Sequence, residues 1–264
     1  MMSHYSNREF GASNSTDYRM YIMQQDQPIS PFHDIPLVHS PPSIMNMVVE
    51  IPRWSNAKME ICKEEILNPI KQDVKKGKLR FVNNVFPHKG YIWNYGALPQ
   101  TWEDPSHVDP DTKSKGDNDP IDVCEIGSRI LARGSIVPVK ILGILAMIDE
   151  GNFLSKITLL IVWASDYPLL HIDDVEKHMP GFLQATREWF RNYKVPTGKP
   201  KNEFAFDGNF KNREFALKIV NQTHEQWKKL VTEKTDFTGL YKYVNGNFIY
   251  MSQAHFFHLR GSSY

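Results

Sequence analysis

An acidic turn in the middle of the chain holds the residues best suited to chemistry. Residues 115–125 read KGDNDPIDVCE, so Asp117, Asp119 and Asp122 stand close together and lead into an apolar run. Carboxylates this close repel one another, which raises their pKa values unless a cation lies among them. Divalent ions with oxygen ligands meet that need. Asp-rich turns are also common in solvated loops, so the turn alone leaves both interpretations open.

Basic residues upstream of the turn supply the other half of a phosphate site. Arg53 ends a predicted strand, and Arg80 follows one strand later. Between them, Lys58 and Glu60 alternate on an extended segment and therefore share one face. Cations of this kind bind phosphate oxygens, while acids hold the metals that bridge those oxygens. Each residue alone is more commonly a surface charge, but the combination favours a metal-assisted phosphate site.

The elements that must position these residues are mainly strands. Residues 63–76 carry helix formers that Pro69 divides into two short pieces. Downstream, the apolar residues recur at helical spacing around 182–190 and 215–230. Strands followed by two long helices predict a mainly β fold with α, a compact barrel with helices packed outside. The strongest strand candidates, rich in β-branched residues, are 44–51, 121–126, 136–148 and 157–163.

Composition bounds the class of protein. A chain of 264 residues without an internal repeat predicts one domain over 17–264, preceded by a flexible segment over 1–16. The formal net charge of +1 provides no field that would attract nucleic acid or a membrane surface. Cys62 and Cys124 lack zinc-binding spacing and are interpreted as core thiols in a reducing compartment. No apolar run suits a signal peptide or a membrane span, so we expect a soluble, cytoplasmic protein.

Several ordered motifs give the chain a recognisable likeness. It resembles the family I soluble inorganic pyrophosphatases, and their eukaryotic branch in particular, from about Tyr5 to about Trp227. The motifs that carry the resemblance are FHDIPL at 32–37, MVVEIPRW at 47–54, KGKLRFV at 76–82, FPHKGYIWNYGALPQTWEDP at 86–105, DNDPIDV at 117–123, DEG at 149–151 and YKVPTGKP at 193–200.

The resemblance implies a fold, a reaction and a set of roles. The fold would be an OB-like closed β-barrel with helices packed outside, and the protein would be a homodimer. Three or four Mg²⁺ ions would assist hydrolysis of pyrophosphate to two orthophosphates. Asp119 would accept the proton of the attacking water, and Glu50 would order water. The implied metal ligands are Asp117, Asp122, Asp149 and Glu60. The implied phosphate-binding residues are Lys58, Arg80, Tyr95, Lys156, Tyr193 and Lys194, of which Lys58, Arg80 and Tyr95 also count as catalytic.

The sequence departs from the family pattern at one position. The family motif places an aspartate, the remaining ligand of the first metal, where this chain has Leu154. Leucine offers no oxygen, so we expect weaker Mg²⁺ binding at that site. Two interpretations stay open: a pyrophosphatase with a weakened metal site, or a catalytically silent relative that serves as a binding or structural subunit.

A nucleic-acid-binding role is a third hypothesis. OB-like barrels bind single strands through aromatic side chains and a basic groove, and residues 86–102 are rich in aromatics. The acids beside those aromatics would repel a phosphate backbone unless metals intervened, so we expect no nucleic-acid partner.

Overall fold

The computed structural model describes residues 5–41, 43–111, 114–148, 155–163 and 171–232. The predicted site residues Asp149 and Leu154 lie outside these ranges, and so does the C-terminal segment 233–264. The backbone of Lys156 is described as part of a strand.

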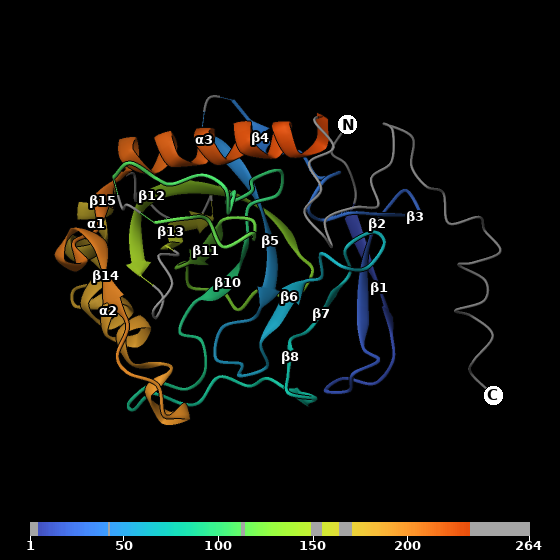
Figure 1. Cartoon of the computed structure of the whole chain (residues 1–264), viewed down its shortest axis with the longest axis horizontal. Helices are drawn as coiled ribbons and strands as arrows, with labels where there is room; N and C mark the ends of the chain where they lie inside the picture. Colours follow the sequence, from blue (N-terminus) through green and yellow to red (C-terminus); the bar gives the residue numbers. More distant parts are fainter. Residues whose placement is uncertain (1–4, 42, 112–113, 149–154, 164–170, 233–264) are drawn as a thin grey trace.

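Five strands form the central barrel. They are β5 (Ile44–Ile51), β10 (Asn94–Ala97), β11 (Asp122–Glu125), β12 (Ile136–Ile148) and β13 (Ser155–Trp163). β5 pairs with β10, which pairs with β11, and β11 runs parallel to β13. The long strand β12 pairs with both β13 and β5 and so completes the ring (Figure 1). The predicted OB-like barrel is therefore confirmed.

Short strands extend the barrel sheet. They are β4 (Val38–Ser40), which pairs with β5, and β14 (Glu203–Phe204) and β15 (Lys211–Asn212), which both pair with β12. A separate hairpin joins β8 (Val74–Lys75) to β9 (Lys78–Leu79).

A second sheet stands beside the barrel. It contains β1 (Tyr5–Phe10), β2 (Arg19–Gln24), β3 (Gln27–Ile29), β6 (Met59–Ile61) and β7 (Ile70–Gln72). β1 pairs with β2 along its whole length, from Tyr5 opposite Gln24 to Phe10 opposite Arg19. The prediction of a flexible segment over 1–16 is therefore wrong for Tyr5–Phe10. That strand is polar and mostly exposed, and its order comes from pairing with the buried strand β2.

Residues 63–76 do not form the predicted helical pieces. Their second half forms β7 and β8 instead, and Leu67 and Asn68 adopt positive φ angles of 63° and 45°. Ile70 pairs with both Met20 and Ile61 and is fully buried. Tertiary strand pairing therefore overrides the helix propensity of this segment.

Three α-helices cover the barrel: α1 (Ile172–His178), α2 (Phe182–Asn192) and α3 (Arg213–Thr232). α2 and α3 confirm the predicted amphipathic helices. α3 lies across the barrel in Figure 1 and buries Ala216, Ile219 and Val220 against the strands. α2 packs Phe190 on Trp93 with ring centroids 4.8 Å apart. Of the described helices, none combines the length and apolar character that a membrane span requires.

Candidate functional site

A polar pocket of about 170 Å³ opens between the barrel and the second sheet. Three parts of the chain meet there: the strand pair β5 and β10, the strand β6 with the loop that follows it, and the acidic turn before β11. The charged and tyrosine side chains in its lining include Glu50, Lys58, Glu60, Lys63, Tyr95, Asp119 and Asp122. The fold thus brings together several predicted site residues that are far apart in sequence.

Asp73 joins the two predicted phosphate-binding cations. Its Oδ2 atom lies 2.9 Å from the Lys58 ammonium and also forms an ion pair with the Arg80 guanidinium. Glu60 lies 2.6 Å from the same lysine. Burial alone would raise the pKa of Asp73, but the charges and hydrogen bonds of Lys58 and Arg80 outweigh burial and lower it. Asp73 is therefore anionic at neutral pH and holds both cations beside the pocket.

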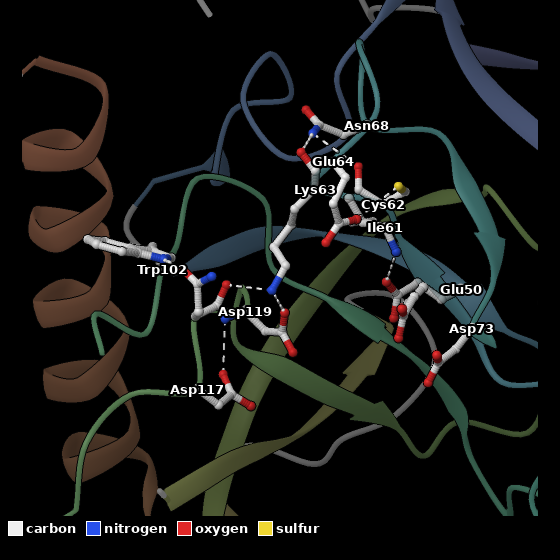
Figure 2. Close-up of polar contacts among 12 residues, drawn as sticks. Glu50, Ile61, Cys62, Lys63, Glu64, Asn68, Asp73, Trp102, Asp117 and Asp119 are labelled. Carbon is white, nitrogen blue, oxygen red and sulfur yellow. Dashed lines mark hydrogen bonds and ion pairs between the residues drawn. The ribbon is translucent and has the colours of Figure 1, made fainter. Parts of the chain in front are cut away.

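The acidic turn is held by its own backbone and by its neighbours. Asn118 has a φ of 70°, a left-handed conformation that asparagine tolerates better than most residues. Its side-chain oxygen accepts a 2.9 Å hydrogen bond from the Trp102 indole. The Asp119 N–H donates to Asp117 Oδ1 at 3.0 Å. These contacts fix the directions of the turn carboxylates before any ligand arrives (Figure 2).

Glu50 reports the electrostatics of the pocket floor. Burial, the main cause, raises its pKa to about 8, and the carboxylates of Asp122 and Glu60 push it the same way. The Ile61 N–H, 2.7 Å from Glu50 Oε1, and the Lys58 ammonium act in the opposite direction. The floor therefore lacks enough positive charge for all its acids to ionise at neutral pH.

The donor chemistry fits a hard divalent cation. Carboxylate oxygens are the ligands that Mg²⁺ prefers, and a cation would relieve the repulsion that raises the Glu50 pKa. Within the described ranges, no three His, Cys, Asp or Glu side chains converge closely enough to hold an ion by themselves. Asp149, a further predicted ligand, is outside those ranges. The described acids thus fit part of a ligand set.

Other predicted residues lie around the pocket rather than in it. Among the described residues that line the pocket, Arg80, Tyr193 and Lys194 are not included. Arg80 is tied to the site through Asp73. Tyr193 ends α2, and the Lys194 ammonium lies 5.5 Å from its ring centroid.

A row of rings links Tyr193 to the pocket. Tyr95 lies 5.2 Å from Tyr91, Tyr91 lies 5.1 Å from Trp189, and Trp189 stacks on Tyr193 at 5.0 Å, all between ring centroids. The aromatic core therefore sets the position of α2 relative to the site.

Arg53 does not take the role that its position in the sequence suggested. Its side chain is buried beneath the barrel and donates to the Glu125 carbonyl at 3.1 Å, with the guanidinium 5.8 Å from the Trp54 ring centroid. The prediction that Arg53 joins Lys58 and Arg80 in binding phosphate is wrong. The strand β5 ends so that this side chain points inward, which the local sequence does not show.

Two polar residues of the site were missed from the sequence. Asp73 follows β7 and contacts both cations, while Lys63 follows β6 and forms an ion pair with Asp119. A signal for Asp73 exists, because Lys58 and Arg80 need an anion nearby when buried together. For Lys63 we find none, because its segment resembles an ordinary charged helix.

The barrel and its pocket define an OB-like protein whose site combines cations that suit anionic oxygens with acids that suit metal ions. A family model described as inorganic pyrophosphatase matches residues 47–228. The inorganic pyrophosphatase of Mus musculus is 58% identical over 243 residues, which cover 90% of this chain and 83% of that protein. That of Schizosaccharomyces pombe is 55% identical and covers 92% and 85%.

Solved structures agree with the sequence relatives. The inorganic pyrophosphatase of Schistosoma japonicum superimposes with a TM-score of 0.89 at 56% identity, over 95% of this chain and 93% of that one. The Thermus thermophilus enzyme gives 0.57 at 25% identity, over 75% and 99%. The chain belongs to the inorganic pyrophosphatase family, of the family I type.

Proposed function

We propose that this protein hydrolyses pyrophosphate to two orthophosphates with the help of Mg²⁺. The observation that carries the proposal is the pocket in which Lys58 and Tyr95 face Asp119 and Asp122. A small doubly phosphorylated anion needs cations for its oxygens and acids for its metal ions, and this pocket offers both within about 170 Å³. Membership of the family supports the same reaction.

Asp117, Asp122 and Glu60 would hold Mg²⁺, together with Asp149 from outside the described ranges. Bound Mg²⁺ would supply a lowered pKa for the attacking water and charge neutralisation for the phosphoryl oxygens. In the family, three or four ions assemble with substrate, and we propose the same number here.

The side chains of the chain itself bind the substrate and move the proton. Lys58 and Arg80, held in place by Asp73, bind phosphate oxygens and stabilise the charge of the leaving orthophosphate. Lys156, Tyr193 and Lys194 bind further phosphate oxygens. Water oxygen bonds to one phosphorus as the bridging P–O bond breaks, and Asp119 accepts the water proton.

Tyr95 would position the substrate from the pocket wall. It stands on β10, and its side chain lines the pocket beside Lys58. Its hydroxyl would donate a hydrogen bond to a phosphate oxygen.

Release of orthophosphate tests the proposal directly. Purified protein with millimolar Mg²⁺ and pyrophosphate is expected to release two orthophosphates per substrate, and EDTA is expected to stop release. Removal of Mg²⁺ leaves the acids of the pocket mutually repelling and the phosphate oxygens unscreened. Release in EDTA at an undiminished rate would contradict the Mg²⁺ requirement.

Leu154→Asp is expected to tighten the Mg²⁺ dependence of hydrolysis at least about tenfold, because an added carboxylate supplies one inner ligand and one full charge. The measurement is the Mg²⁺ concentration that gives half-maximal orthophosphate release. Leu154→Asn is the matched control, since it adds an oxygen of similar shape without the charge. If the natural protein is silent and Leu154→Asp is active, the silent-subunit hypothesis holds; an unchanged Mg²⁺ dependence contradicts the assignment of residue 154 as a ligand position.

The homodimer is also proposed, with support from an exposed aromatic surface. Trp54, Phe81 and Phe86 are 49%, 51% and 95% exposed, and backbone hydrogen bonds such as Val82 N–H to the Asn56 carbonyl join their segments. We expect sedimentation as a dimer at micromolar concentration and as a monomer after Trp54→Ser with Phe86→Ser. Ile130→Ser, at a similarly exposed apolar residue elsewhere, is expected to leave the dimer intact. A natural protein that sediments as a monomer would contradict the proposal.

The two cysteines bear on the compartment. Cys62 and Cys124 are both buried and free, which agrees with the predicted core thiols. Free thiols are typical of a reducing compartment, so we propose a cytoplasmic location.

A further inference from the structure

A lysine from the loop after β6 reaches into the acidic turn. The Lys63 ammonium forms an ion pair with Asp119 and donates a 2.8 Å hydrogen bond to the Asn118 carbonyl. Its side chain is 17% exposed, so the contact lies within the pocket wall rather than in open solvent. Figure 2 shows the chain of Lys63 extended toward the turn from a segment more than fifty residues away in sequence.

The loop that carries Lys63 is held independently of the acidic turn. Asn68 donates to the Cys62 carbonyl at 3.1 Å and to the Lys63 carbonyl at 3.4 Å. The Ser30 hydroxyl in turn donates to Asn68 Oδ1 at 2.6 Å, and Asn68 is buried. The backbone of Lys63 is therefore anchored to the second sheet, and only the flexible side chain joins it to Asp119.

An ammonium group in this place has two effects on the neighbouring acids. It neutralises part of the repulsion among the turn carboxylates, which stabilises the turn without a metal. It also repels a divalent cation that enters the same pocket, and an acid paired with an ammonium is a poorer proton acceptor. The arrangement seen here therefore suits the resting protein and opposes the reaction proposed for Asp119.

We propose that Lys63 is a positioning residue that serves as a built-in counter-ion of the acidic turn, which divalent cations must displace from Asp119 when they bind. The proposal rests on the Mg²⁺-dependent function proposed above. It makes metal entry an exchange of cations, in which the long side chain of Lys63 withdraws while its anchored backbone stays. Lys63 thereby lowers the affinity of the substrate-free protein for Mg²⁺.

The sign of the effect separates this role from simple structural support. Lys63→Met keeps the length of the side chain and removes the charge, so Mg²⁺ should bind the substrate-free protein about tenfold more tightly, or about 1.4 kcal/mol. Loss of a merely structural contact would leave Mg²⁺ affinity unchanged or weaken it. Lys71→Met is the matched control, because Lys71 pairs with Glu65 at 3.0 Å on the neighbouring strand β7 and removes the same net charge.

Isothermal titration of Mg²⁺ into the three substrate-free proteins tests the proposal. Tighter binding by Lys63→Met, with Lys71→Met equal to the natural protein, supports it. Equal or weaker binding by Lys63→Met overturns it, and so does equal tightening by Lys71→Met. Orthophosphate release by the natural protein is measured in parallel. If release occurs while Lys63→Met binds Mg²⁺ no more tightly, the counter-ion role fails and the proposed function stands; if the natural protein neither binds Mg²⁺ nor releases orthophosphate, both fail.

A measurement on the natural protein covers the case in which Lys63→Met does not fold. Nuclear magnetic resonance of the lysine ammonium groups should show one protected ammonium, that of Lys63, in the metal-free protein. Saturating Mg²⁺ should abolish its protection as the side chain leaves Asp119. Protection that persists at saturating Mg²⁺ would overturn the proposal.

Discussion

Asp122→Asn is expected to lower the rate of pyrophosphate hydrolysis at least about a thousandfold, or about 4 kcal/mol in the barrier. Asp122 begins β11, is 6% exposed, and lines the pocket beside Glu50, whose pKa it helps to raise. Asparagine keeps the shape and one oxygen but removes the charge. Because the substrate carries several negative charges, loss of this carboxylate removes the attraction for the cations that must accompany it.

Orthophosphate release across a range of Mg²⁺ concentrations measures this effect. Asp111→Asn is the control, because Asp111 forms a surface pair with Lys218 at 3.1 Å and is expected to leave the rate within about twofold. Circular dichroism of both variants checks that the barrel is folded. A rate for Asp122→Asn within tenfold of the natural protein would contradict the metal-binding role of this residue.

Gly96→Ala is expected to lower the free energy of unfolding by about 4 kcal/mol. Gly96 lies in the middle of β10, between Tyr95 and Ala97, where the register with β5 shifts. A Cβ atom there would overlap the Val48 carbonyl oxygen and come within 3.1 Å of the Glu50 nitrogen. Both atoms belong to a rigid central strand, so the two strands must separate to make room.

Urea unfolding followed by tryptophan fluorescence measures the change. Gly77→Ala is the control for backbone freedom: Gly77 has a φ of 72° in the β8–β9 hairpin, but nothing lies within 4 Å of its would-be Cβ. We expect about 1 kcal/mol for that variant. Equal losses for the two variants would show that conformational strain, rather than the close approach of β5 and β10, makes Gly96 necessary.

The position of Gly96 also connects stability with the site. The same β5–β10 pairing that Gly96 permits places Glu50 and Tyr95 on neighbouring strands in one pocket. A variant that folds with these strands separated would therefore lose the alignment of Tyr95 with Lys58 and the acids. A fall in hydrolysis larger than the fall in the folded fraction would be the sign of this displacement.

Strand and helix periodicity in the sequence predicted much of the architecture. The β-branched run at 136–148 predicted β12 with its observed bounds, and the helical spacing of apolar residues predicted α2 and α3. Such patterns are readable because the near neighbours along the chain and one buried face dictate them. The prediction failed for 63–76, where burial of Ile70 between Met20 and Ile61 decides the conformation.

The site divides in the same way. By itself, the sequence determined which residue types are present and their order: an acidic turn beside an apolar strand, and basic residues on earlier strands. Only the tertiary structure decided which charges meet, because the meeting depends on strands paired across long stretches of chain. It turned Arg53 into the interior, joined Lys58 to Arg80 through Asp73, and set Lys63 on Asp119. Ion pairs act over a few ångströms of space, whatever their separation in sequence, so their partners follow from the pairing of strands and not from local pattern.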